Sequence, residues 1–206
     1  MIQIFGDERS GNCLKVKWTL DHLHRSYRWQ HVEVLTGETR TPSFLAINPA
    51  GQVPAVILED GRSLAQSNTI VLYFAQGTPL VPADPYEYAR MLEWMFWEQY
   101  SHEPFIAVRR FQRLYLGRSD DEIAPRLMEG GAAALARMEA HFRSQRWLVG
   151  NSLSAADICL LPYTALAPDG GFTLGDYPEI QAWIERTSAA LGLSMRSDIT
   201  PAGKES

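Results

Sequence analysis

Residues 48 to 67 read NPAGQVPAVILEDGRSLAQS, and this stretch decides the fold of the first part of the chain. Two apolar runs, Ala55–Leu58 and Ser63–Leu64, flank the dipeptide Asp60-Gly61. Aspartate and glycine tolerate the positive φ values of a two-residue hairpin turn, so the stretch predicts two antiparallel strands joined there. The periodicity of Ser67–Ala75 predicts a helix directly after the hairpin.

The residues before this hairpin alternate between strand-like and helix-like patterns. Met1–Phe5 and Tyr27–Val34 predict strands, Asn12–Leu23 predicts a helix between them, and Pro42–Ile47 predicts a second, short helix. Alternation of this kind is typical of an α/β domain.

A proline-rich segment separates this part from the rest of the chain. Residues 79–85 hold three prolines, which favour a stiff, extended linker. Every later pattern is helical, beginning with a long aromatic-rich stretch from Tyr86 that Pro104 is expected to kink or break. We therefore predict one domain over residues 1–78 and an all-helical domain over residues 86–206.

Two capping boxes predict helix starts in the second domain. In such a box, a serine and an acidic side chain three residues later each accept a hydrogen bond from the other's backbone N–H. Ser119 with Glu122 predicts one helix, and Ser154 with Asp157 predicts another. Pro178 suits the first position of a helix and predicts the start of the last one.

Composition and charge narrow the functional classes. The chain has 206 residues, 46% of them hydrophobic, with no apolar run of about 18 residues and no signal-peptide pattern, so we expect a cytoplasmic protein without a membrane partner. A net charge of −5 makes nucleic acid an unexpected partner. Cys13 and Cys159 are far apart and near no histidine cluster, so two reduced thiols and no metal site are predicted.

The order of these motifs resembles that of the cytosolic glutathione transferase superfamily, in its bacterial theta/nu-like type. Asn48–Pro54 resembles the family's loop before the third strand, Gln66-Ser67 its γ-glutamyl-binding pair, and Leu153–Ile158 its helix-capping motif. The resemblance covers nearly the whole chain. It implies an α/β thioredoxin-like N-terminal domain plus an all-α C-terminal domain, a homodimer, and glutathione as co-substrate with no other cofactor.

The resemblance assigns a glutathione-binding role to Gln52, Val53 and Pro54. The cysteinyl part of glutathione needs a backbone N–H and C=O to pair with, as an added strand does. A cis Val53-Pro54 bond presents these groups, and the resemblance makes the cis form the expected one, although few X-Pro bonds are cis.

Two further residue groups are candidates for binding the carboxylates of glutathione. Gln66 and Ser67 open a helix, where the amide and hydroxyl of Ser67 can hold the γ-glutamyl carboxylate. Ser67 can also serve simply as a helix N-cap. Arg40 can meet the glycine carboxylate or remain a solvated surface charge.

The chemistry is expected in the loop that leads into the first helix. The resemblance implies that the Ser10 hydroxyl donates to the glutathione sulfur. Lowering a thiol pKa by two units takes about 2.7 kcal/mol. A charge-assisted hydrogen bond supplies about 1.5–3 kcal/mol, and a helix N-terminus adds about 0.3–1 kcal/mol. Asn12 is the alternative sulfur partner, unless it is an N-cap. Cys13 is a third candidate, for which burial in the core is the favoured interpretation.

The site of the second substrate is less defined by the sequence. Tyr100 and Phe105 are the predicted pocket residues in the aromatic stretch of the helical domain. His102, Arg109 and Arg110 are interpreted as solvated side chains.

These features favour conjugation of glutathione to small apolar electrophiles. Arg9-Ser10 also matches the maleylacetoacetate isomerase signature, but Gly11-Asn12 departs from the Ser-Cys that follows in that signature, which argues against an isomerase. Two alternatives stay open. One is a glutathione-dependent disulfide or peroxide oxidoreductase, and the other is a non-catalytic binding or regulatory protein on the same fold.

Overall fold

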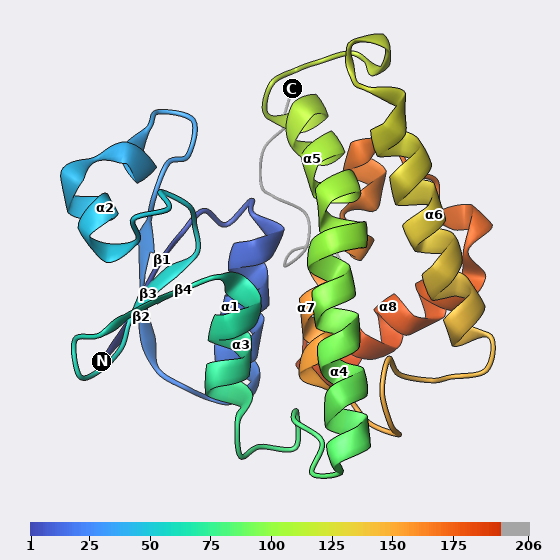
Figure 1. Cartoon of the computed structure of the whole chain (residues 1–206), viewed down its shortest axis with the longest axis horizontal. Coiled ribbons are helices and arrows are strands. Elements are labelled where there is room, and N and C mark those ends of the chain that lie inside the picture. The colour runs from blue at the N-terminus through green and yellow to red at the C-terminus, as the bar shows by residue number, and fades with distance from the viewer. Residues whose placement is uncertain (195–206) are drawn as a thin grey trace. The chain divides into compact units, whose positions relative to one another are not determined.

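The computed structural model describes residues 1–194, so residues 195–206 of the predicted second domain lie outside the described range. The chain divides into two compact units, Met1–Thr78 and Pro79–Ser206. The first unit, blue to green in Figure 1, combines a sheet with helices, and the second is built from helices. The predicted α/β and all-helical organisation is confirmed.

Four strands and three helices form the first unit. They are β1 (Ile2–Gly6), α1 (Gly11–His22), β2 (Tyr27–His31), α2 (Pro42–Ile47), β3 (Ala55–Ile57), β4 (Ser63–Ala65) and α3 (Ser67–Ala75), with a 3₁₀ turn at Glu38–Arg40. The strand order is β2-β1-β3-β4. β1 pairs parallel with β2 and antiparallel with β3, and β3 pairs antiparallel with β4 as the hairpin pattern predicted. The predicted two-residue turn is wrong: the Leu58 N–H donates to the Arg62 carbonyl across residues 59–61, and of these three only Gly61 has a positive φ.

Helices cover both faces of this sheet (Figure 1). Ile2 and Ile4 of β1 lie in one buried cluster with apolar side chains of α1, β3 and α3. Phe5, whose side chain points to the opposite face, packs edge-on against Phe44 of α2 with 6.5 Å between ring centroids. The alternation of side chains along a strand therefore provides both core layers.

The second strand is shorter than predicted. β2 ends at His31 rather than Val34, because its partner β1 ends at Gly6. The Val32 N–H still donates to the Gly6 carbonyl at 2.9 Å, and beyond it the chain enters a turn.

The helices of the second unit are α4 (Pro85–Trp97), α5 (Glu103–Leu114), α6 (Pro125–Phe142), α7 (Ala155–Ala165) and α8 (Pro178–Leu191). Short 3₁₀ turns lie at Asp120–Glu122, Ala167–Gly170 and Leu174–Asp176. α7 forms the centre of the core, since ten of its eleven residues are buried. α8 begins at Pro178 as predicted.

Pro104 widens the helix instead of ending it. α4 runs through a π-helical segment, Glu98–His102, into α5, and Figure 1 shows the two helices as nearly one rod. Proline has no N–H to donate to the carbonyl four residues earlier, and a π turn accommodates that missing bond.

The two capping boxes form, but only one starts a long helix. Ser154 with Asp157 caps α7 as predicted. Ser119 with Glu122 caps only a 3₁₀ turn, and α6 begins at Pro125. The predicted helix start at Ser119 is wrong because a residue before proline is disfavoured in the helical region. Ala124 is accordingly extended, at φ −52° and ψ 124°.

Candidate functional site

Ser10 stands at the junction between β1 and α1. It is the N-cap of α1, with φ −81° and ψ 119°, and its carbonyl accepts from Cys13 and Leu14 N–H groups at 3.0 Å. Its own N–H donates to the Asp7 carbonyl at 3.0 Å. The side chain makes no capping hydrogen bond, so the helix does not consume the half-buried hydroxyl.

The Cys13 thiol contacts this hydroxyl. Burial raises the pKa of its thiol to about 12, although a hydrogen bond with the Ser10 side chain acts to lower it. The thiol therefore stays protonated at neutral pH, as the burial interpretation predicted. In the bond that lowers this pKa, Ser10 donates to the sulfur. The sulfur of a neutral thiol is a weak acceptor, so the Ser10 hydroxyl can turn to a stronger one.

The start of α3 adjoins the start of α1. Ser67 is the first residue of α3, and its hydroxyl donates to Asn12 Oδ1 at 2.9 Å. Asn12 is thus not an N-cap, since Ser10 occupies that position. Two predicted site residues from separate motifs are brought together, and so are the N-termini of two helices, each carrying partial positive charge.

Gln66 directs the chain into α3 through an uncommon backbone conformation. It is the N-cap of α3, so Ser67 does not hold that position, and its φ of +69° lies in the left-handed region. Few residues other than glycine adopt such values, and they concentrate at functional sites. The exposed Gln66 side chain makes no capping bond.

The loop before β3 is organised by a buried asparagine. Asn48 Nδ2 donates to the Gln52 carbonyl at 2.7 Å, and the Ala50 N–H donates to Asn48 Oδ1 at 3.2 Å. The Val53-Pro54 peptide bond is cis, as predicted.

Arg40 lies against this same loop. Its Nη1 donates to the Ala50 carbonyl at 3.2 Å, and the side chain is exposed. The structure thus places this cation beside the turn that precedes Val53-Pro54.

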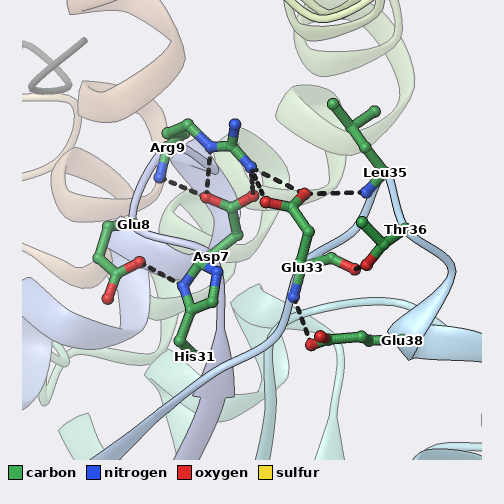
Figure 2. A network of polar contacts seen from close by, with 8 residues as sticks. All are labelled: Asp7, Glu8, Arg9, His31, Glu33, Leu35, Thr36 and Glu38. Carbon is green, nitrogen blue, oxygen red and sulfur yellow. Dashed lines mark hydrogen bonds and ion pairs between the residues drawn. The ribbon is translucent and has the colours of Figure 1, made fainter.

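A charged network surrounds the loop before Ser10 (Figure 2). Arg9 bridges the carboxylates of Asp7 and Glu33. The hydrogen bond from the Leu35 N–H lowers the pKa of Glu33, and the Arg9 side chain adds a smaller effect in the same direction. Farther out, His31 Nδ1 lies 2.8 Å from a Glu8 carboxylate oxygen, which raises the pKa of His31.

The two predicted pocket residues of the helical unit differ in environment. Tyr100 belongs to the π-helical segment and is 84% exposed. Phe105 is half-buried, and its ring packs onto Gly130 of α6 so closely that a Cβ there would overlap it.

Comparison with known proteins identifies the family. Residues 9–76 match the model for the glutathione S-transferase N-terminal domain, and residues 95–190 match the model for the C-terminal domain. A crystal structure of a glutathione S-transferase from Pseudomonas fluorescens is 42% identical, with a TM-score of 0.89 over 97% of this chain and 98% of that one. This chain belongs to the glutathione S-transferase family.

Curated members of this family with different names are similarly distant. Glutathione S-transferase 3 of Zea mays is 29% identical over 91% of this chain and 89% of its own length. Maleylacetoacetate isomerase of Rhizobium meliloti is 30% identical over 92% of both chains. The thioredoxin-like domain followed by a helical domain is thus the glutathione S-transferase fold, as the motifs predicted.

The prediction that His102 is solvated is wrong. It is fully buried, and its Nε2 lies 3.0 Å from Thr164 Oγ1 in α7. The bond crosses 62 residues of sequence, so nothing local to His102 indicates it.

The prediction of surface positions for Arg109 and Arg110 is also wrong. Arg109 Nε donates to the Gly170 carbonyl at 2.7 Å, and its Nη2 pairs with Asp120 at 2.6 Å. Arg110 pairs with Asp169 at 2.9 Å. Both arginines are buried, and α5 packs against the Ala167–Gly170 turn that carries two of these acceptors.

A buried lysine, not predicted from the sequence, joins the two helices of the candidate site. Lys15 of α1 is 0% exposed, and its Nζ donates to Asn68 Oδ1 of α3 at 3.2 Å. Asn68 directly follows Ser67, so this contact and the Asn12–Ser67 bond join the same two helices. The sequence has no local signal for this contact, because Lys15 and Asn68 are 53 residues apart.

Two absences can be stated for residues 1–194. No helix in this range is long and apolar enough to cross a membrane. The same residues contain no group of three or more His, Cys, Asp or Glu side chains arranged to hold a metal ion.

Proposed function

We propose that this family member is a glutathione transferase that binds glutathione on its first unit and conjugates the thiolate to small apolar electrophiles. Ser10 donates its hydroxyl hydrogen to the glutathione sulfur. Gln52, Val53 and Pro54 pair with the cysteinyl part. Glutathione is the co-substrate, and the proposal includes no other cofactor.

The observation that carries the proposal is the meeting of the α1 and α3 N-termini through the Ser67–Asn12 hydrogen bond. Two helix N-termini together favour an anion. Glutathione brings a γ-glutamyl carboxylate for Ser67 and Gln66 at α3, and a sulfur that becomes anionic near Ser10 at α1. Arg40 is proposed to meet the glycine carboxylate.

The hydroxyl of Ser67 already donates a hydrogen bond to Asn12 Oδ1. A serine hydroxyl has one hydrogen to donate, so the backbone N–H of Ser67 is the proposed donor to the carboxylate. Asn12 is the alternative sulfur partner, since the Ser67 bond uses its Oδ1, whereas a bond to sulfur would be donated by its Nδ2.

The second substrate is proposed to contact Tyr100 and Phe105 of the helical unit. An exposed aromatic ring with a polar tip suits an apolar electrophile that carries a polar substituent. We also propose that the protein is cytoplasmic and acts as a homodimer, as the family resemblance implies for the dimer.

The test is calorimetric titration with glutathione, followed by ultraviolet absorbance of the bound thiolate, in the parent and in Ser10→Ala. We expect both proteins to bind glutathione and only the parent to show thiolate absorbance at neutral pH. Ser63→Ala, an exposed serine of β4, is the matched control and should behave like the parent. A parent protein that does not bind glutathione would overturn the proposal.

Mass spectrometry of the products then tests the reaction class. A transferase yields a glutathione thioether, an oxidoreductase yields oxidised glutathione, and an isomerase releases glutathione unchanged. Turnover of aryl or alkyl halides to thioethers is expected. Oxidised glutathione as the sole product would favour the oxidoreductase instead.

A further inference from the structure

The guanidinium of Arg9 forms a bridge between two carboxylates on different parts of the first unit (Figure 2). Toward Asp7, its Nε lies 3.0 Å from Oδ1 and its Nη2 lies 2.7 Å from Oδ2. The same Nη2 lies 3.0 Å and 2.9 Å from the two Glu33 oxygens. The planar fork of arginine suits such a bridge, whereas a lysine ammonium offers a single charge centre.

The Asp7 end of the bridge is built into the turn that presents Ser10. Asp7 is 1% exposed, and the Arg9 N–H donates to its Oδ1 at 2.8 Å. The Ser10 N–H donates to the Asp7 carbonyl. Residues 7–10 are thus held by backbone and side-chain bonds that centre on Asp7.

The Glu33 end is anchored in the segment that leads to Arg40. Glu33 Oε1 accepts from the Leu35 N–H at 3.0 Å, and the Glu33 N–H donates to Glu38 Oε2 at 2.8 Å. Glu38 opens the 3₁₀ turn that ends at Arg40. One guanidinium therefore links the proposed thiol-activating end of the site to the segment of the proposed glycine-carboxylate contact.

We propose that Arg9 is a positioning residue for the thiol chemistry, because its bridge from Asp7 to Glu33 holds Ser10 where its hydroxyl meets the glutathione sulfur. The inference rests on the proposed function of Ser10. A hydrogen bond weakens steeply as its angle bends, so a looser turn at residues 7–10 would leave the thiol less ionised even while glutathione still binds.

The alternative role is that of an ordinary surface ion pair, which contributes little. The chain supplies such a pair for comparison. Arg62 and Asp60 have the same two-residue spacing, with the Arg62 N–H 3.0 Å from Asp60 Oδ1 and its Nε 2.8 Å from Oδ2. This pair lies in the exposed hairpin turn.

Glu33→Ala cuts the bridge and leaves intact the pair between buried Asp7 and half-buried Arg9. It also separates positioning from charge, because the two effects have opposite signs. Removing an anion near a thiolate favours the thiolate through space and lowers the thiol pKa. Loss of a correctly placed Ser10 donor raises that pKa. Arg9→Lys keeps the charge and loses the fork, so only positioning can change its result.

The experiment titrates thiolate absorbance against pH in saturating glutathione for the parent, Glu33→Ala, Arg9→Lys and the control Arg62→Lys. In Glu33→Ala and Arg9→Lys, we expect the pKa of the glutathione thiol to rise by about one unit. At a given pH this lowers the thiolate-to-thiol ratio about tenfold. The dissociation constant of glutathione should change less than about threefold, a difference below 1 kcal/mol. Circular dichroism confirms that each variant is folded.

An unchanged or lowered thiol pKa in Glu33→Ala would overturn the positioning role, and so would a parent-like Arg9→Lys. An equal rise in Arg62→Lys would also overturn it, since any arginine pair would then have the effect. If the parent shows no thiolate absorbance, the proposed function of Ser10 fails, and this outcome differs from all the others.

Discussion

Asp157→Ala should destabilise this protein far more than any other loss of a capping residue. The carboxylate is fully buried and accepts four hydrogen bonds. Ser154 donates through its N–H at 3.0 Å and its hydroxyl at 2.7 Å. The Leu148 N–H donates at 3.1 Å and Trp183 Nε1 at 2.9 Å. One side chain thus caps α7 and ties it to α8 and to the segment before it.

The magnitude follows from what the substitution leaves behind. Three N–H donors and a hydroxyl would be buried without a partner, at about 1–3 kcal/mol for each group that water cannot reach. The Ser154 hydroxyl can turn to another acceptor, so we expect a loss of about 3–5 kcal/mol, as for other broken buried charge networks. At about 2–4 °C per kcal/mol, the melting temperature should fall by roughly 6–20 °C.

Glu122→Ala is the matched control, because Glu122 completes the same motif at the surface. Its Oε2 accepts from the Ser119 N–H at 2.9 Å and from the Ser119 hydroxyl at 2.8 Å, with both residues exposed. Water replaces these bonds, so a loss of at most about 1 kcal/mol is expected. Differential scanning calorimetry measures both variants. Two results would refute the idea that burial determines how much a capping box stabilises the protein. One is an equal decrease in melting temperature in both variants, and the other is a decrease of less than about 2 °C in Asp157→Ala.

Three further predictions concern other parts of the chain. Gly131→Ala in α6 should lower the free energy of unfolding by about 1–3 kcal/mol in urea denaturation, because its Cβ would overlap the buried Phe172 ring; an unchanged midpoint would show that the core can repack. Cys13 has a pKa of about 12, so an aromatic disulfide reagent at pH 8 should modify it only after unfolding, and rapid labelling of the native protein would contradict its burial. The Glu8 carboxylate raises the pKa of His31, so this pair stabilises the fold below about pH 6.5 and loses its effect as pH rises through the His31 pKa. Glu8→Gln should lower the His31 pKa in an NMR titration, and an unchanged pKa would remove Glu8 as the cause.

Local chemistry made much of this fold predictable. The Asp60-Gly61 turn, the Ser154–Asp157 box and Pro178 each act through neighbours in sequence, and each element they predict is present. The wrongly predicted helix start at Ser119 also has a local cause, because Pro125 follows the capping box closely in the sequence. A proline three residues beyond a box limits it to a short turn.

The misjudged polar residues of the helical unit have distant partners. His102 bonds to Thr164, and Arg110 pairs with Asp169. Each pair spans about 60 residues, and a single sequence has no signal for such contacts. For the same reason, the sequence marked Ser10 as functional but did not show that the neighbouring Arg9 reaches Glu33, 24 residues away.

The two serines of the proposed site look alike in the sequence, since each precedes or opens a helix, but the structure gives their hydroxyls different uses. Ser67 has donated its hydrogen to Asn12, so it offers a ligand mainly its backbone N–H at the first turn of α3. Ser10 faces the Cys13 thiol, which stays protonated because burial raises its pKa to about 12. A neutral thiol accepts a hydrogen bond only weakly, so we propose that the Ser10 hydrogen turns to the incoming sulfur. Burial of Cys13 thus serves the proposed chemistry, because an ionised thiol at that position would compete with glutathione for the same hydrogen.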